Sequence, residues 1–221
     1  MEKLIDKIIQ NPLFLQLKDV VENNIYHNHE DVYSHSLKVK NTAQREIKAD
    51  FITNPDAKKR FLEFVEEDFY GYKRADIMIL VALLHDIGKI LQVKEGGTIR
   101  SLLVTNEEGI TSCPGHEYWG STIVSEITKD LSLPRETVEY IANVIKLHDT
   151  FNAQYWLDRK DWTMDTLLND VKSRAEGLYK EALFNIYCDC FTAAPFQSAK
   201  EVIVKIFNEP KLYERREYVI P

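Results

Sequence analysis

An unbroken apolar run at residues 77–84 is followed directly by an imidazole and a carboxylate, at His85 and Asp86. A helix this apolar is driven into the core, and an ionisable pair carried in with it is costly to bury unless another group satisfies both side chains. A metal ion would satisfy them, because it binds nitrogen and oxygen ligands together. The run therefore predicts a helical core with a polar centre.

The spacing of apolar residues predicts helices along most of the chain, while strand-like alternation is short and confined to the region after Lys89. Residues 1–23 are expected to form one or two amphipathic N-terminal helices. The remaining predicted helices span 31–50, 56–69, 74–87, 116–130, 134–148, 163–188 and 197–207. The fold class is therefore all-α, a single-domain helical bundle.

Length and composition favour one domain. A chain of 221 residues of which 44% are hydrophobic can build one sizeable core. We expect this domain to span residues 1–221, with the metal-site core at about 30–195 and a C-terminal helix and tail at 196–221.

One segment within 91–115 departs from the helical pattern. Residues 98–104 and 110–112 are expected to form a small hairpin around the Asn-Glu-Glu-Gly turn at 106–109. Such an excursion is a candidate lid.

Charge and composition exclude several classes of function. The formal net charge of −7 gives no general attraction to nucleic acid or anionic membranes, and we interpret the basic groups at 58–60 and 215–216 as solvated faces. No apolar stretch approaches the about 20 residues that cross a bilayer, and the N-terminus lacks the apolar core of a secretory signal. We expect a cytoplasmic protein without a membrane partner, whose three cysteines are buried thiols.

Five ionisable side chains lie on the apolar stripes of separate predicted helices, so each is expected to point toward the interior: His35, His85, His116, His148 and Asp189. A single histidine on such a stripe is more often a hydrogen-bonded core residue than a ligand. Five on separate helices indicate a metal centre instead. Imidazole nitrogens with carboxylate oxygens suit zinc, manganese, iron or nickel, and mixed sites with an open position are typical of catalysis.

The order of these residues adds a family resemblance. His35, the adjacent pair His85-Asp86 and the distant Asp189 resemble the pattern of the HD-domain metal-dependent phosphohydrolases, over roughly residues 30–195. The spacing of these three elements on separate helices is more specific than the two-letter motif itself. The resemblance implies an HD-type helical bundle.

Three short segments carry a closer likeness, Leu-His-Asp-Ile-Gly-Lys at 84–89, Gly-His-Glu at 115–117 and Val-Ile-Lys-Leu-His at 144–148. Their order is similar to the HD domain attached to bacterial CCA-adding tRNA nucleotidyltransferases. Nothing upstream of His35 provides the Gly-Ser turn and paired aspartates of the nucleotidyltransferase head, so we expect a freestanding HD domain. The chain also resembles the six-ligand HD-GYP phosphodiesterases, but their Gly-Tyr-Pro element is missing, so cyclic di-GMP is not an expected substrate.

The resemblance implies a set of metal ligands: His35, His85, Asp86 and Asp189 for a first ion, and His116 and His148, with Asp86 bridging, for a second. An alternative is a single ion, with His116 and His148 contacting phosphate. The expected cofactor is one or two divalent ions of manganese, zinc, nickel, iron or magnesium.

Two residues are expected to be catalytic, Asp86 and Lys89. With one metal, Asp86 or Glu117 would accept a proton from the metal-bound water. Lys89 shares the ligand face and reaches a bound phosphate if the helix continues past Gly88. Substrate binding is assigned to Lys89, Glu117 and Lys146, although Glu117 points about 100° away from its histidine neighbour on a helix, and a surface position is an equal alternative.

These observations predict a metal-dependent phosphohydrolase or phosphodiesterase (EC 3.1 class) acting on a nucleotide or related small phosphoester. A non-catalytic sensor or adaptor module that binds a nucleotide or metal is one alternative, because a fold alone does not fix activity. An iron-dependent oxygenase of HD type is another, and a bundle with coincidentally buried histidines is a third. The substrate, the identity of the metal and the oligomeric state stay open at this point.

Overall fold

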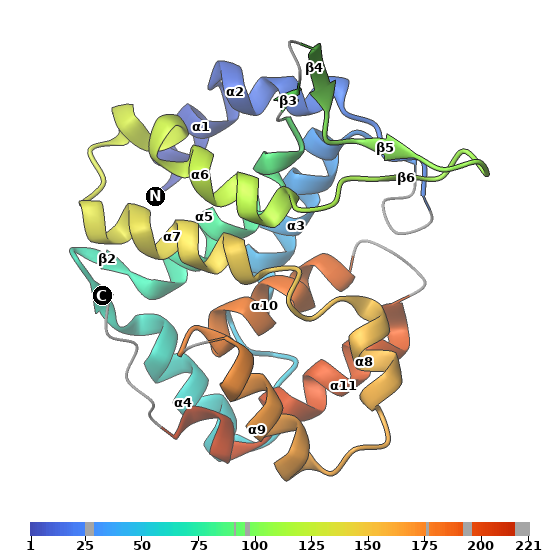
Figure 1. The fold of residues 1–221 in the computed structure, drawn as a ribbon. Coiled ribbons are helices and arrows are strands. Elements are labelled where there is room, and N and C mark those ends of the chain that lie inside the picture. Colours follow the sequence, from blue (N-terminus) through green and yellow to red (C-terminus); the bar gives the residue numbers. More distant parts are fainter. Residues whose placement is uncertain (25–28, 91, 96–97, 176, 192–195, 215–221) are drawn as a thin grey trace.

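The structure is a computed structural model that describes residues 1–24, 29–90, 92–95, 98–175, 177–191 and 196–214. Within these residues it contains eleven α-helices and three two-stranded antiparallel sheets (Figure 1), so the predicted all-α class is confirmed. None of these helices is long and apolar enough to cross a membrane. From residue 215 onward, the predicted tail lies outside the described residues.

The α-helices are α1 (Glu2–Ile9), α2 (Pro12–Leu15), α3 (Val32–Glu46), α4 (Pro55–Glu66), α5 (Arg74–Leu84), α6 (His116–Thr128), α7 (Arg135–Leu147), α8 (Ala153–Arg159), α9 (Met164–Arg174), α10 (Tyr179–Cys190) and α11 (Gln197–Phe207). The 3-10 helices are η1 (Gln16–Asp19), η2 (Ile87–Ile90), η3 (Lys129–Leu131) and η5 (Pro210–Tyr213). The strands are β1 (Asp68–Phe69), β2 (Tyr72–Lys73), β3 (Gln92–Glu95), β4 (Thr98–Ser101), β5 (Val104–Thr105) and β6 (Thr111–Ser112).

Polar caps fix where several helices begin. At the start of α3, the Asp31 carboxylate accepts a hydrogen bond from the backbone N–H of Ser34 at 2.8 Å. At the start of α4, Asn54 caps the helix and Pro55 fills the first position, where no backbone hydrogen bond is needed. Such caps stabilise a helix by about 1 kcal/mol. The Asp31 cap bears on function because it sets the start of the helix that carries His35.

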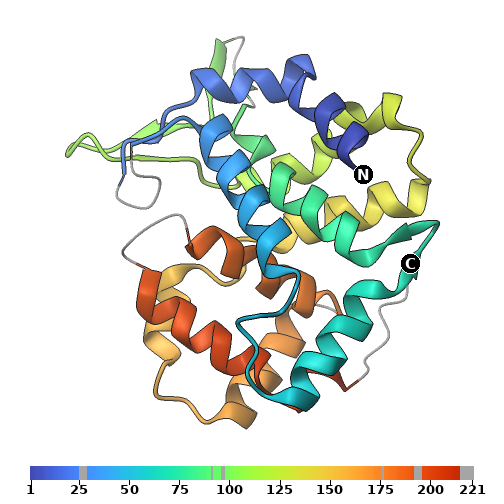
Figure 2. The ribbon, with the colours of Figure 1, turned by 180° about the vertical axis from the view of Figure 1, so that it is seen from behind.

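Helix α5 lies at the centre of the bundle, and residues 77–84 are all buried, as the apolar run predicts. Figures 1 and 2 show α3 beside α5, and α6 and α7 packed against each other on one side. Helices α8 to α11 and α4 make up the other half of the molecule. Helix α10 packs against α3, α5 and α7. The C-terminal end of α5 is therefore a meeting point of several helices.

A buried polar network fixes the other end of α5. The Arg74 guanidinium donates hydrogen bonds to the Tyr140 hydroxyl at 2.7 Å and to the Glu181 carboxylate at 2.9 Å. The Tyr140 hydroxyl also donates to Glu181. These residues belong to α5, α7 and α10, so one charged cluster holds the three helices in a fixed relation.

Several helices differ from their predictions. The helix predicted at 31–50 ends at Glu46, and the one predicted at 56–69 ends at Glu66, with residues 68–69 in strand β1 outside the region predicted to contain strands. The predicted helix 163–188 is two helices, α9 and α10, which are separated near Gly177, whose φ of +91° is a left-handed conformation that favours glycine. The short helix α8 was not predicted. Helix α5 ends at Leu84 rather than at residue 87, and the 3-10 helix η2 follows it. The last difference changes where Asp86 and Lys89 point.

The insertion within 91–115 contains two hairpins instead of one. Strand β5 pairs with β6 around the turn at 106–109, as predicted, with Val104 opposite Ser112. The residues of β4 pair backward with β3 instead of joining that hairpin, with Thr98 opposite Glu95. The prediction overlooked β3 because a strand of four residues gives little alternation to detect.

The second hairpin is attached to the segment that precedes α3. The side-chain amide of Asn23 donates to the backbone oxygen of Gly109 at 2.7 Å, and that of Asn24 donates to the backbone oxygen of Thr111 at 3.0 Å. The backbone N–H of Thr111 in turn donates to the backbone oxygen of Asn23 at 3.2 Å. The hairpin and this segment therefore form one continuous wall beside the end of α5.

Candidate metal centre

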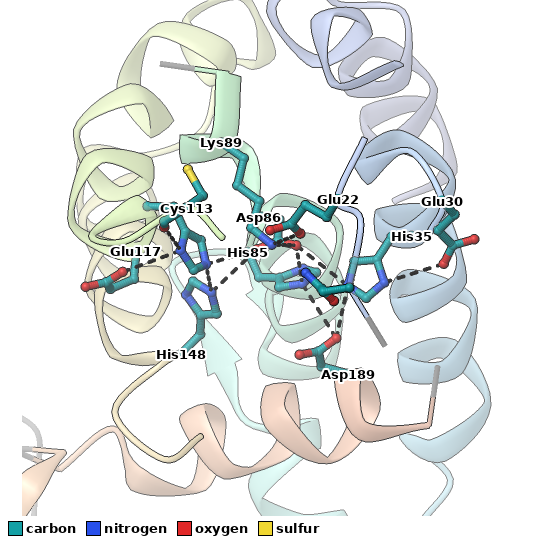
Figure 3. Close-up of polar contacts among 12 residues, drawn as sticks. Glu22, Glu30, His35, His85, Asp86, Lys89, Cys113, Glu117, His148 and Asp189 are labelled. Atoms are coloured by element: carbon teal, nitrogen blue, oxygen red, sulfur yellow. Dashed lines mark hydrogen bonds and ion pairs between the residues drawn. The ribbon is translucent and has the colours of Figure 1, made fainter. Parts of the chain in front are cut away.

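The six predicted ligands come together at the C-terminal end of α5 (Figure 3): His35 from α3, His85 and Asp86 after α5, His116 from the start of α6, His148 after α7 and Asp189 from the last turns of α10. Four of them are buried. His116 and Asp189 are partly exposed, with 13% and 33% of their side chains accessible. The expectation that every stripe residue points into the interior therefore holds only in part.

The first cluster contains two imidazoles and two carboxylates. His35 Nε2 lies 3.0 Å from Asp189 Oδ1 and 3.6 Å from Asp86 Oδ2. His85 Nε2 lies 3.4 Å from Asp86 Oδ2 and 4.0 Å from Asp189 Oδ1. All four side chains therefore present a nitrogen or oxygen atom to the same small volume.

The second cluster uses the other oxygen of Asp86. His116 Nε2 lies 3.1 Å from Asp86 Oδ1, and His148 Nε2 lies 3.7 Å from the same oxygen. The two Nε2 atoms are 2.9 Å apart. Asp86 thus faces one histidine pair with each carboxylate oxygen, which is the arrangement of a bridging ligand.

Three of the four histidines are held by their outer ring nitrogen. Each Nδ1 lies within hydrogen-bond distance of the backbone oxygen three residues earlier: Ala82 for His85 at 2.9 Å, Cys113 for His116 at 2.8 Å, and Ile145 for His148 at 2.6 Å. A ring that donates its Nδ1–H has its lone pair on Nε2, the atom that faces the cluster. Histidines that bind metals are oriented in this way.

The donor set therefore fits a divalent metal ion. His85 Nε2 is buried and has no hydrogen-bond partner among the described residues, so a ligand bond would satisfy an atom that is otherwise costly to bury. Histidine nitrogens with carboxylate oxygens suit manganese, iron, nickel and zinc. Glu30, at 3.7 Å from His35 Nδ1, supplies an outer carboxylate of the kind that supports a metal-bound histidine.

Charges within the first cluster favour a cation. Burial disfavours protonated His35, but the nearby Asp189 and Glu30 carboxylates outweigh burial and raise its pKa to about 9. Burial lowers the pKa of His85, so this ring is neutral, the form that binds metals. Burial also opposes ionisation of Asp86, yet the Lys89 ammonium, the strongest of several neighbouring influences, holds the pKa of Asp86 well below its usual value. A metal ion would take the place of the proton on His35.

Lys89 lies on η2 and reaches the centre from there rather than along the face of α5. Its Nζ donates to Asp86 Oδ2 at 2.9 Å and to Glu22 Oε2 at 2.5 Å. Burial would lower the pKa of Lys89, but both carboxylates raise it, so the ammonium stays charged. Glu22 was not among the predicted site residues: it lies at the end of the predicted N-terminal helical segment and meets Lys89 only through the fold.

A cavity of about 430 Å³ opens beside the second cluster, and its lining comprises Asp86, Lys89, Ser112, His116, His148, Asp149, Phe151, Asn152, Ala153, Gln154, Ile186, Asp189, Cys190 and Phe196. Of the predicted substrate-binding residues, Lys89 lines it. Lys146 is exposed on α7 and is not part of the described lining. Glu117 contacts His116 instead, with Oε2 at 3.6 Å from Nδ1.

Comparison with protein families agrees with this geometry. The HD domain matches residues 32–184, a span that contains five of the six ligands and ends before Asp189. No curated protein matches the chain, so the likeness to the HD domain of CCA-adding enzymes and the freestanding arrangement stay predictions. Because the match covers more than half of the sequence, the chain belongs to the HD-domain family.

Proposed function

We propose that the protein is a metal-dependent phosphohydrolase or phosphodiesterase that acts on a nucleotide or related small phosphoester. The observation that carries this proposal is the position of Asp86, with one oxygen toward His35 and His85 and the other toward His116 and His148. A carboxylate shared in this way suits two-metal hydrolysis of phosphoesters. Membership of the HD-domain family, whose members are typically metal-dependent phosphohydrolases, supports the same reaction class.

The proposed ligands form two sets: His35, His85, Asp86 and Asp189 for one ion, and Asp86, His116 and His148 for the other. A bound divalent ion would supply an acidified water and a Lewis acid for the phosphoryl oxygens. With a single ion in the first set, His116 and His148 would instead contact the phosphate.

Asp86 and Lys89 are the proposed catalytic residues. Lys89 lines the cavity 2.9 Å from Asp86, so its ammonium lies where it can face phosphoryl oxygens. In the single-ion case Asp86 or Glu117 would accept a proton from the attacking water. Glu117 contacts the ring of His116 and would fix its orientation. Lys146, exposed at the end of α7, would contact only a part of the substrate that projects from the cavity.

The test is hydrolysis of a panel of nucleotides and simple phosphomonoesters and phosphodiesters by protein loaded in turn with manganese, zinc, nickel, iron and magnesium. Asp86→Ala should abolish turnover because it removes a ligand from both clusters. Asp161→Ala, which removes an exposed carboxylate outside the site, is the matched control and should retain full activity. Absence of turnover with every metal and every phosphoester would refute the proposal.

Measurements of binding and of metal content, made beside the hydrolysis assay, separate the alternative functions. Nucleotide binding with a measurable dissociation constant but no product would favour a sensor or adaptor. Metal analysis after anaerobic purification would reveal iron if the protein were an oxygenase. Elemental analysis also counts the ions, so it distinguishes one metal from two.

A further inference from the structure

The cavity beside the metal centre has few cations. Lys89 is the only lysine or arginine in its described lining, which also contains three carboxylates, Asp86, Asp149 and Asp189. Each phosphate that a substrate carries beyond the first adds negative charge that some cation must offset. The proposed metal ligands Asp86, His116, His148 and Asp189 belong to this lining, and among its described residues only Lys89 would add a lysine or arginine charge to that of the bound metal.

Glu22 reduces the effect of Lys89, the one lysine or arginine among the described lining residues. Its carboxylate lies 2.5 Å from Lys89 Nζ, and Asp86 lies 2.9 Å away on the other side. All three side chains are 3% exposed or less, so solvent screens these interactions weakly. The ammonium is therefore matched by two carboxylates and adds little net positive charge to the cavity.

Apolar side chains make up much of the remaining wall. Phe151, Ile186 and Cys190 are buried residues that line the cavity, and Phe196 lines it as well. The polar side chains of Ser112, Asn152 and Gln154 are also part of the lining. An apolar wall with a small number of polar groups suits the flat ring of an organic leaving group. At about 430 Å³ the cavity lies within the range of small-molecule sites.

We infer that the cavity selects a phosphomonoester with a single phosphate and a leaving group that carries a flat ring, such as a nucleoside monophosphate, over the corresponding diphosphate and triphosphate. This inference rests on the proposed function and names its substrate class. Glu22 is then a specificity-determining residue, because it cancels the charge of Lys89, which would otherwise attract more highly charged substrates.

The experiment compares adenosine mono-, di- and triphosphate, and ribose 5-phosphate, with the manganese-loaded protein. Wild type should show a kcat/KM for the monophosphate at least about tenfold above that for the triphosphate, the effect of roughly one unit charge in a partly screened site. Ribose 5-phosphate should react less well than adenosine monophosphate. Calorimetric binding of methylene phosphonate analogues of the monophosphate and triphosphate should give the same order.

Two variants test the role of charge. Glu22→Gln keeps the shape of the side chain but removes its charge, and it should reduce the preference for the monophosphate about tenfold, mainly by lowering KM for the triphosphate. Ala153→Lys, at a partly exposed lining position, adds a cation without touching the core and should shift the preference in the same direction. Asp19→Asn removes an exposed charge from the same N-terminal segment and should leave the preference unchanged.

Equal use or equal binding of monophosphate and triphosphate by wild type would overturn the inference. So would a Glu22→Gln variant that folds but affects all the phosphates alike, or an Ala153→Lys variant with an unchanged preference. If no phosphoester is hydrolysed, the proposed function fails, and the binding order of the two analogues still decides whether the cavity selects a single phosphate.

Discussion

The contact between Gly88 and helix α6 provides the sharpest prediction about the centre. A Cβ atom at residue 88 would lie 2.0 Å from the backbone oxygen of His116, 2.4 Å from the backbone nitrogen of Gly120 and 2.9 Å from its Cα. All three are backbone atoms, so no side chain can rotate away to make room. Gly88→Ala therefore forces η2 and α6 apart by about 1 Å or more, the shortfall from ordinary van der Waals distance.

The size of the effect follows from this geometry. Extra methyl groups in a packed core cost about 1 to 3 kcal/mol when neighbouring side chains can adjust. Since backbone lies on the far side of the contact, we expect a loss near the upper end, about 3 kcal/mol of unfolding free energy. For a chain of this size that corresponds to a fall in Tm of about 6 to 12 °C. The same movement would lengthen the 3.1 Å distance between Asp86 and His116, so metal content should fall as well.

Urea unfolding and elemental analysis of the purified variant measure both effects. Gly120→Ala is a graded comparison, because its Cβ would lie 3.2 Å from the backbone nitrogen of Gly88 and from a methyl group of Ile145, and it should cost less. Gly71→Ala is the matched control: its Cβ would meet nothing within 4 Å, and its φ of +85° adds only backbone strain of about 1 kcal/mol. If Gly88→Ala is no more destabilising than Gly71→Ala, the described approach of η2 to α6 is wrong.

Three further predictions concern stability. Stripping the metal with a chelator should lower Tm, measured by calorimetry, by about 5 to 10 °C. The reference is protein with free metal at about 100 times its Kd, where binding adds about 2.7 kcal/mol of stability. An unchanged Tm would contradict a metal site. Arg74→Met should cost about 3 kcal/mol or more in urea unfolding, because it removes the guanidinium that pairs with the buried Glu181 carboxylate at 2.9 Å. Arg135→Met, which breaks an exposed pair, should cost under about 0.5 kcal/mol. Asn208→Ala should cost about 1 to 3 kcal/mol of unfolding free energy, because Asn208 Oδ1 accepts hydrogen bonds from the backbone N–H groups of Thr53 and Asn54, at 2.7 and 2.8 Å. Equal stability of the variant would show that water replaces these bonds.

Five of the six candidate ligands could be picked out because each lies on an apolar stripe, and Asp86 could be because it follows His85 directly. His35 and Asp189 lie on amphipathic helices whose buried faces can be predicted from the spacing of apolar residues. The apolar run before His85 predicts that this helix is buried on all sides. Periodicity says which way a side chain points, so it selects residues that can meet in a core. Which oxygen of Asp86 faces which histidine pair depends on how the helices are arranged, and no local pattern contains that information.

The predictions that failed concern short elements and contacts between distant segments. Strand β3 and helix α8 are too short to show a period. The spacing of Ile87 from Leu83 and Leu84 favours a helix to residue 87, whereas α5 ends at Leu84. Glu22 meets Lys89 across 67 positions of sequence. Such a pair becomes visible only when the bundle is assembled, since no local pattern relates Glu22 to Lys89.

Three residues with different roles lie within the four positions 86–89 that follow α5. Their positions in the site depend on the 3-10 turn η2 that replaces a continued α-helix. Asp86 supplies a shared carboxylate, Gly88 allows the backbone of α6 to approach, and Lys89 returns a charge to Asp86 at 2.9 Å. A continued α-helix would have carried Lys89 along the face of α5; the 3-10 turn η2 instead brings it beside Asp86, while Gly88 brings His116 close enough to face the other oxygen. Substitutions at these positions therefore act on one rigid unit, and their effects on metal binding should be non-additive.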